Sequence, residues 1–272
     1  MNEQATPRRR SAHPVLAIGI DIGGSGIKGA TVDLRTGTLA TPRHRIRTPQ
    51  PSGPVNVIPV VRHVAEMIRK DLGRSDLPVG VTFPAPILDG MTMSAANVDA
   101  DWIGYPAARA LSNTLDAPVA LINDGDAAGL AEMRFGAGRG HHGVVLLLTL
   151  GTGVGSALFV DGRLVPNTEL GHVEIRGKDA ERRSAAVNRT TRGLSWQAWA
   201  ALLDEHIRAL DRLLWPDVII LGGGVSKNAD RFLGYLTARP PIIVAKLRGD
   251  AGIVGAALFA ARAAKMHLPP VR

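Results

Sequence analysis

Two glycine-rich turns of similar design are the parts of this 272-residue sequence best suited to bind phosphate. Each follows an apolar segment, turns through small residues and continues into a second apolar segment that ends in Val-Asp, over residues 19–33 and 147–161. Glycine lets the backbone approach an anion closely and take positive φ, so that successive N–H groups can face phosphate oxygens. A single turn of this kind is weak evidence, but one copy in each half predicts a phosphate chain held between two related lobes. The residues expected to contact it are Asp21, Gly23, Gly24, Ser25, Gly26 and Lys28 from the first copy, and Thr149, Gly151, Thr152 and Gly153 from the second.

Asp21 stands directly before the first turn, where a carboxylate would repel a phosphate group unless a cation lay between them. The sequence therefore predicts Mg²⁺ held by Asp21 through water. An aspartate can also simply bond its own backbone in a turn, but this turn already has enough glycine, which favours the metal role. Lys28, beyond the turn, is equally compatible with a phosphate ligand and with an exposed strand lysine.

Asn123-Asp124-Gly125-Asp126 lies where a predicted buried strand (119–123) becomes a helix (124–134). Proteins of the α/β class bind ligands at the ends of such strands. The grouped amide and carboxylates can bind vicinal hydroxyls, and one carboxylate can accept a hydroxyl proton as general base. An aspartate can also be the helix N-cap. Asp126 is well placed for that, which leaves Asp124 for the chemistry.

Two further segments complete the candidate site. Residues 169–174 bring Glu169 and His172 together just after the second glycine-rich copy, and such side chains suit a polyol, although a surface turn with a solvated histidine has the same composition. The triplet Gly222-Gly223-Gly224 ends another predicted strand and would let a nucleotide ribose or base approach the backbone. Glycines also serve ordinary tight turns, so this triplet alone is weak evidence.

The elements that must position these residues alternate between strands and helices. In the first half, apolar patterns predict strands at 15–22, 26–32, 79–83 and 119–123, and helices at 54–70 and 124–134. A turn signal at 35–38 predicts a further, polar strand at 43–47. In the second half they predict a hairpin of 143–150 and 155–160, helices at 194–214, 229–236 and 251–264, and strands at 217–221 and 242–247. The repeated plan predicts an α/β fold of two similar lobes with a cleft between them. We expect a basic flexible tail at 1–14, a small N-terminal lobe at 15–124 and a larger C-terminal lobe at 125–272, whose last helix could pack back on the N-terminal lobe.

Composition narrows the class of protein. Hydrophobic residues make up 45% and charged residues 21%, as in folded proteins, and no apolar run is long enough to span a bilayer or to serve as a signal peptide, so a cytoplasmic location is expected. Cysteine is absent, which excludes disulfides and thiolate metal sites. The net charge of +8 fits either a basic tail with scattered surface charges or a polyanionic ligand. Only 4% aromatic residues and no helix-turn-helix pattern argue against nucleic acid.

Five segments of the sequence, taken together, resemble the ROK family of sugar kinases. They are the first turn with Asp21, the Asn123-Asp124 pair, the turn at 150–155, the segment Glu169-Leu170-Gly171-His172 and the triplet region 221–226. That family belongs to the actin-like, sugar-kinase ATPase superfamily. The resemblance runs in order from residue 15 to about residue 264, and over 169–199 it is closest to the polyphosphate glucokinase branch.

The resemblance implies a two-lobed, ribonuclease H-like fold with a hexose in the cleft and Asp124 as the catalytic base. It implies that the hexose hydroxyls are held by Asn123, Asp124, Glu169, His172 and Glu181. The two glycine-rich turns and the triplet would hold the phosphoryl donor, polyphosphate or ATP, with glucose and mannose as acceptors and Mg²⁺ as cofactor. ROK kinases commonly bind zinc through a cysteine cluster after the Gly-His motif. This chain has no cysteine, so no zinc is expected.

Polyphosphate adds the requirement of a basic path leading from the glycine-rich turns, for which the candidates are Arg176, Lys178, Arg182 and Arg183. A solvated loop explains the same four residues equally well.

The other functions left open are an ATP-only hexokinase, an N-acetylmannosamine kinase and a sugar-responsive regulator without catalysis. A transcriptional repressor would need a DNA-reading domain ahead of the kinase-like region, and only 14 residues precede the first predicted strand. Monomer and homodimer are equally compatible with the sequence, and no nucleic-acid or membrane partner is expected.

Overall fold

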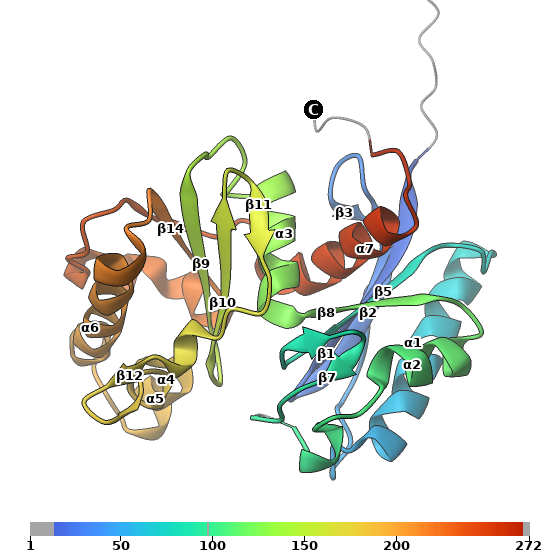
Figure 1. Ribbon diagram of the computed structural model, residues 1–272, viewed down its shortest axis with the longest axis horizontal. Helices are drawn as coiled ribbons and strands as arrows, with labels where there is room; N and C mark the ends of the chain where they lie inside the picture. The colour runs from blue at the N-terminus through green and yellow to red at the C-terminus, as the bar shows by residue number, and fades with distance from the viewer. Residues whose placement is uncertain (1–13, 97, 269–272) are drawn as a thin grey trace, which may run out of the picture.

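The computed structural model describes residues 14–96 and 98–268, which fold around two sheets (Figure 1). We call the part built on the first sheet the N-terminal lobe and the part built on the second the C-terminal lobe. Residues 1–13 of the predicted basic tail lie outside the described residues. Within the described ranges, no helix combines the length and apolarity that crossing a membrane requires.

The sheet of the N-terminal lobe has the order β3-β2-β1-β5-β8, with β4 also paired to β2. β1 (Leu16–Gly23) and β2 (Gly26–Asp33) form an antiparallel hairpin that closes at the facing pair Gly23 and Gly26. β5 (Val79–Phe83) and β8 (Val119–Asn123) continue the sheet parallel to β1. The carboxyl ends of β1, β5 and β8 therefore lie at one edge of this sheet, where α/β proteins bind ligands. The lobe's smaller elements are β3 (Thr38–Leu39), β4 (His44–Ile46), β6 (Ile87–Leu88), β7 (Met91–Thr92), η1 (Ala100–Trp102) and α2 (Ala107–Leu115).

Helix α1 (Pro54–Leu72) packs on this sheet because its apolar residues share one face. Val57, Val61, Val64 and Ile68 follow helical spacing and are buried. Proline at the first helical position is compatible with the helix start, and Gly73 ends the helix in the left-handed conformation at φ 68°.

The C-terminal lobe repeats the plan, with the sheet order β11-β10-β9-β14-β15. β9 (Val144–Leu150) and β10 (Val154–Val160) form the second hairpin, and β14 (Val218–Gly222) runs parallel to β9. Helix α6 (Trp196–Leu214) packs its apolar face within this lobe's core. The remaining elements are β11 (Arg163–Val165), η2 (Leu170–His172), β12 (Glu174–Ile175), β13 (Lys178–Asp179), α4 (Glu181–Ser184), α5 (Ala186–Thr191), η3 (Gly224–Arg231), η4 (Leu233–Tyr235), β15 (Ile242–Val244) and η5 (Arg248–Asp250).

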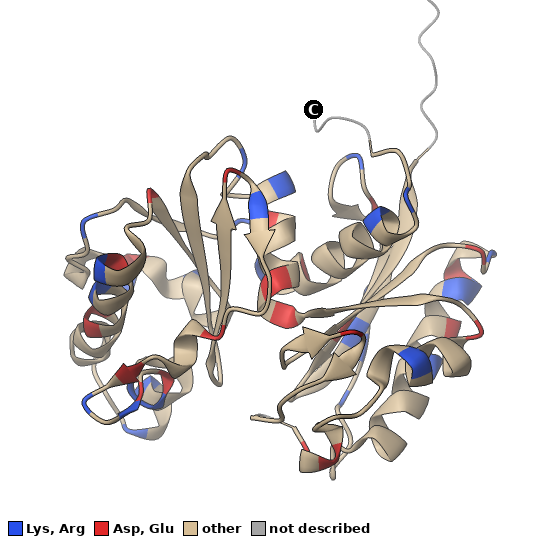
Figure 2. Ribbon diagram, viewed as in Figure 1, with Lys and Arg blue, Asp and Glu red and all other residues tan. Residues whose placement is uncertain are grey.

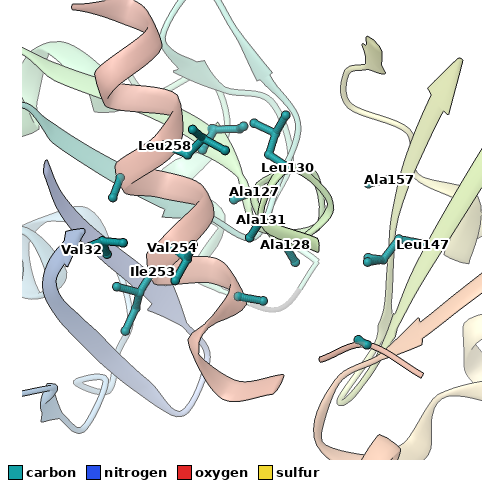
Figure 3. Packing of buried hydrophobic residues seen from close by; sticks show 14 of the residues in the cluster. Val32, Ala127, Ala128, Leu130, Ala131, Leu147, Ala157, Ile253, Val254 and Leu258 are labelled. Atoms are coloured by element: carbon teal, nitrogen blue, oxygen red, sulfur yellow. The ribbon is translucent and has the colours of Figure 1, made fainter. Parts of the chain in front are cut away.

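Helices α3 (Asp124–Phe135) and α7 (Ala251–Ala263) pack against each other between the two sheets (Figures 1 and 3). Glycine makes the close approach possible. A Cβ at Gly80 would lie 1.9 Å from the carbonyl oxygen of Ala256, and one at Gly255 would lie 1.8 Å from that of Ala127. Because α7 also contacts β1 and β5, this packing fixes the first turn of α3 relative to both sheets.

The two-lobed α/β architecture expected from the sequence is confirmed, but some elements differ from their predictions. The α-helix predicted at 229–236 is wrong, because the chain forms the 3₁₀ helices η3 and η4, with non-helical backbone at Asn228. The strand predicted at 242–247 ends at Val244, since the N–H groups of Lys246 and Leu247 donate to the Glu132 carboxylate instead of a neighbouring strand. Helices α2, α4 and α5 were not predicted.

Candidate active site

Two adjoining cavities open between the lobes, and Asp124, Thr149 and Gly223 line both of them. The first cavity has a volume of about 390 Å³ and the second about 350 Å³. Acidic positions at the start of α3 lie between the lobes, whereas Lys and Arg positions are spread over both (Figure 2). The first cavity is lined by the predicted residues Gly23, Gly24, Ser25, Asn123, Gly151, Thr152, Gly153, Glu169, His172 and Glu181, and the second by Asp21, Lys28, Gly222 and Gly224.

Asp124 stands where the two cavities meet, as the first residue of α3. Its Oδ1 accepts a hydrogen bond from the N–H of Gly125 at 2.8 Å. Burial at the base of the cleft raises the pKa of Asp124 from 3.8 to about 7, and the negative charges of Asp21, Glu169 and Asp126 act in the same direction. A carboxyl group with such a pKa is matched to taking up a proton near neutral pH.

The N-cap of α3 is Asn123, so the prediction that Asp126 has this role is wrong. The Oδ1 of Asn123 accepts from the Asp126 N–H at 3.0 Å, which is the usual N-cap geometry. Asp126 itself is buried, and its Oδ2 accepts from the N–H of Asn167 at 2.8 Å. Burial raises its pKa to about 6. Asn167 in turn bonds both backbone groups of Ile87, at 2.9 and 3.0 Å, and so joins the two lobes beside the cleft.

The first cavity has a polar wall made largely of carboxylates. Asn123 Nδ2 donates to Glu169 Oε1 at 3.2 Å, and Glu181 Oε2 accepts from the N–H of Val154 at 2.8 Å. His172 Nε2 lies 3.9 Å from Glu169 Oε2. Burial raises the pKa of Glu169, although the nearby His172 opposes the shift. Oxygen acceptors and an imidazole that face one cavity can bind several hydroxyl groups of one small molecule.

His206 supports this wall from behind, and no sequence pattern predicted this role. It is 1% exposed on α6, its Nε2 lies 3.0 Å from the carbonyl oxygen of Leu170, and its Nδ1 lies 2.8 Å from Ser184 Oγ. Burial lowers the pKa of His206, which favours the neutral ring. One neutral imidazole thus connects η2, which carries His172, to α4, which begins with Glu181.

The second cavity contains an ion pair next to a glycine-lined wall. Asp21 Oδ1 accepts from Thr82 Oγ1 at 2.6 Å, and Asp21 Oδ2 lies 3.0 Å from Lys28 Nζ. Asp21 and Lys28 are direct partners across the β1–β2 hairpin. The same ammonium group donates to the carbonyl oxygen of Gly249 at 2.8 Å. Gly252 leaves room for this pair, since a Cβ there would lie 2.6 Å from Asp21 Oδ2.

The two glycine-rich turns line the same cavity from different lobes. Gly23, Gly24 and Ser25 come from the β1–β2 turn, and the residues from Gly151 to Gly153 come from the β9–β10 turn. Gly26 was predicted with them but does not line either cavity; a Cβ there would lie 2.8 Å from Arg45 Nε. Gly223 has a φ of 82°, and a Cβ there would lie 2.3 Å from the Leu150 carbonyl oxygen. The chain after β14 can therefore approach the β9–β10 turn this closely only because residue 223 is glycine.

The four basic residues predicted as a polyphosphate path line neither cavity. Arg176 Nε and Arg183 Nη1 form ion pairs with the two carboxylate oxygens of Glu205, at 2.7 and 3.0 Å. Lys178 and Arg182 are exposed.

Known proteins are similar to this chain in sequence and in architecture. The sequence model of the ROK family matches residues 17–185. A polyphosphate glucokinase of Mycobacterium tuberculosis is 44% identical over 241 residues, which cover 88% of this chain and 89% of that one. The crystal structure of the inorganic polyphosphate/ATP-glucomannokinase from Arthrobacter sp. strain KM is 49% identical and superposes with a TM-score of 0.89, covering 91% of this chain and 99% of that chain.

A more distant structure has the same fold. The ROK family glucokinase of Streptomyces griseus, solved in complex with glucose and AMPPNP, is 23% identical with a TM-score of 0.78, over 91% of this chain and 99% of that chain. The fold is therefore the actin-like ATPase fold of the ROK sugar kinases. With more than half of its length matched by the family model, and with close relatives along most of the rest, this chain belongs to the ROK family.

Proposed function

We propose that this protein is a hexokinase that transfers the terminal phosphoryl group of inorganic polyphosphate or ATP to the 6-hydroxyl of glucose or mannose. The observation that carries the proposal is the position of Asp124, whose pKa is raised to about 7 where a carboxylate-lined cavity meets a glycine-lined one. The names of the relatives support the donors and the hexoses: a polyphosphate glucokinase and a polyphosphate/ATP-glucomannokinase.

The hexose would occupy the first cavity. Asn123 and Glu169 are already linked there by a hydrogen bond of 3.2 Å, so a sugar would meet a wall whose side chains are held in place. Glu169, Glu181 and His172 would accept or donate hydrogen bonds to its ring hydroxyls. Asp124 would reach the one hydroxyl that points toward the second cavity, which we assign to carbon 6.

The phosphoryl donor would lie along the glycine-rich turns. Backbone N–H groups at residues 23–25 and 151–153 would face its terminal phosphates, and Gly222, Gly223 and Gly224 would border the part farther from the sugar. Asp124 takes the proton of the 6-hydroxyl as that oxygen attacks the terminal phosphorus, and the bond to the bridging oxygen breaks. Closure of the lobes would exclude water, which would otherwise compete with the sugar for the phosphoryl group.

A divalent metal cofactor is implied by the kinase relatives, and we propose Mg²⁺. Mg²⁺ commonly keeps several waters and takes one or two carboxylates together with substrate phosphates. Asp21 is the carboxylate we assign to it, since this side chain lines the donor side of the cleft. When bound, the ion offsets the negative charge of the transferring phosphoryl group. We place the reaction in the cytoplasm, where ATP is available.

The test is a donor comparison with the purified protein. Glucose or mannose is incubated with Mg²⁺ and either polyphosphate or ATP, and hexose 6-phosphate is measured for the wild type, for Asp124→Asn and for the control Asp230→Asn, which neutralises an exposed carboxylate on η3. We expect product from both donors with the wild type and the control, and a loss on the order of 10²–10⁴-fold with Asp124→Asn. Product from ATP alone would contradict the polyphosphate assignment. No product from either donor would favour a sugar-binding regulator without catalysis.

A further inference from the structure

A third cavity adjoins the second, and Asp124 does not line it. Lys227, Ala245, Arg248 and Gly249 line both the second and the third cavity, so the two lie side by side. The volume of the third cavity is about 690 Å³, and Lys246 and Arg43 line it without lining the second cavity. Residues 244–250, which run from the end of β15 through η5, make up most of its lining.

Three cations on this route are free to bind an anion. Lys227, Lys246 and Arg248 are exposed, and the part of the chain that the structure describes gives none of their charged groups a hydrogen bond or an ion pair. Among the described residues, Asp250 is the only acid that lines the third cavity, and its Oδ1 lies 2.8 Å from Arg43 Nη1. The route therefore carries a surplus of unpaired positive charge.

A buried carboxylate holds this basic segment in place. Glu132 on α3 is 1% exposed, and it accepts hydrogen bonds from the N–H groups of Lys246 at 3.1 Å and Leu247 at 2.7 Å. It also accepts from Ala137 N–H at 2.7 Å. Because the helix that begins with Asp124 also anchors this backbone, the main chain that carries Lys246 is fixed relative to Asp124. Such preorganisation lowers the entropy lost on binding a flexible ligand.

We propose that a long inorganic polyphosphate chain leaves the second cavity over Lys227 and Arg248 and continues into the third cavity against Lys246. This inference rests on the proposed function and names where its polymeric donor lies. The triphosphate of ATP is short and would end within the second cavity, whereas a polymer with one negative charge on each inner phosphate must continue beyond it. Lys246 therefore distinguishes the two donors, because it lines only the outer part of the route. Arg176, Lys178, Arg182 and Arg183 are not part of this route. They line none of the three cavities, and two of them, Arg176 and Arg183, form ion pairs with Glu205.

The test compares Lys246→Glu with Lys178→Glu, a matched charge reversal at an exposed lysine of β13. Steady-state kinetics are measured with long-chain polyphosphate, with tripolyphosphate and with ATP. We expect Lys246→Glu to raise the KM for long-chain polyphosphate by about fivefold or more, and to leave kcat/KM for ATP and tripolyphosphate within about twofold of the wild type. Lys178→Glu should change none of the three. Unaltered ATP turnover also shows that the variant is folded.

Salt dependence gives a second readout that folding defects do not imitate. Binding of a linear polyanion releases counterions, so the logarithm of KM for long-chain polyphosphate should rise with the logarithm of salt concentration, and Lys246→Gln should lower that slope by about 0.7–0.9. An unchanged slope, equal effects of Lys246→Glu and Lys178→Glu, or equal losses with ATP and polyphosphate would each overturn the route while leaving the hexokinase intact. A wild type that uses ATP but not polyphosphate would overturn both the route and the proposed polymeric donor.

Discussion

Neutralising Asp124 should abolish activity and at the same time stabilise the folded protein. The burial and the neighbouring carboxylates that suit this group to accept a proton also disfavour its charged form in the folded state. Asp124→Asn keeps the side-chain oxygen that accepts from the Gly125 N–H at 2.8 Å. The substitution therefore removes the charge with little change of shape.

The size of the stabilisation follows from the pKa, which folding raises from 3.8 to about 7. The folded state holds the extra proton between these two values, so ionised Asp124 opposes folding in full only above pH 7 and not at all below the unfolded-state pKa. At about 1.4 kcal/mol per pKa unit, the full destabilisation is on the order of 4 kcal/mol. Between about pH 5.5 and the folded pKa lie about 1.5 units, so the advantage of Asp124→Asn over the wild type should be about 2 kcal/mol larger at about pH 8.5 than at about pH 5.5.

The assay is chemical denaturation of wild type, Asp124→Asn and the exposed-site control Asp230→Asn at both pH values. Other buried carboxyls, such as Asp126, are present in all three proteins and largely cancel in the differences. The activity of the wild type should fall tenfold per unit below about pH 7, because the base must be ionised to accept a proton. A pH-independent difference between Asp124→Asn and the wild type would refute the raised pKa, and with it the physical basis for this residue as the base.

Three further substitutions test how the site is held together. Thr82→Val removes the 2.6 Å hydrogen bond to Asp21, so the Mg²⁺ concentration for half-maximal rate should rise by about threefold or more; an unchanged Mg²⁺ titration would contradict the assignment of the metal to Asp21. Gly255→Val would place a Cβ 1.8 Å from the Ala127 carbonyl oxygen, and should lower the free energy of unfolding by about 3 kcal/mol in denaturation experiments, whereas Gly234→Ala, in open space, should have little effect. His206→Phe removes the links to Leu170 and Ser184 and should raise the KM for glucose by about tenfold, with a smaller change in kcat; a loss confined to kcat would show that His206 does not position the sugar site.

Local sequence patterns predicted the elements that the backbone determines by itself. The hairpin of β1 and β2 follows from two apolar segments around a glycine turn, and its register places Asp21 opposite Lys28. The position of Asp124 follows equally from a strand that changes directly into a helix. In both cases the deciding information lies within a few residues of the site.

The parts that were missed depend on contacts between residues distant in sequence. His206 reaches a carbonyl 36 positions away, and Glu132 reaches a backbone segment 114 positions away. A pattern of spacing shows that a histidine or a glutamate falls on the buried face of a helix, but not which polar group of another element it meets there. The cap of α3 was misassigned for a related reason, since Asn123 and Asp126 are both good capping residues and only the backbone geometry decides between them.

The basic residues show why charge density along the sequence is a poor guide to a polyanion site. The segment 176–183 has four cations in eight positions, yet two of them form ion pairs with Glu205 on α6, and none of the four lines either cavity of the candidate active site. Lys227 and Lys246 belong to separate segments, and neither stands out in the sequence, but both line the third cavity, which adjoins the cavity that contains Asp21 and Lys28. A polymer of phosphates responds to the charge left unpaired along its path. On the proposed route, the positive charge offered to polyphosphate is thus created by the fold, which brings Lys227 after β14 and Lys246 after β15 to the lining of one cavity and gives their charged groups no acidic partner among the described residues.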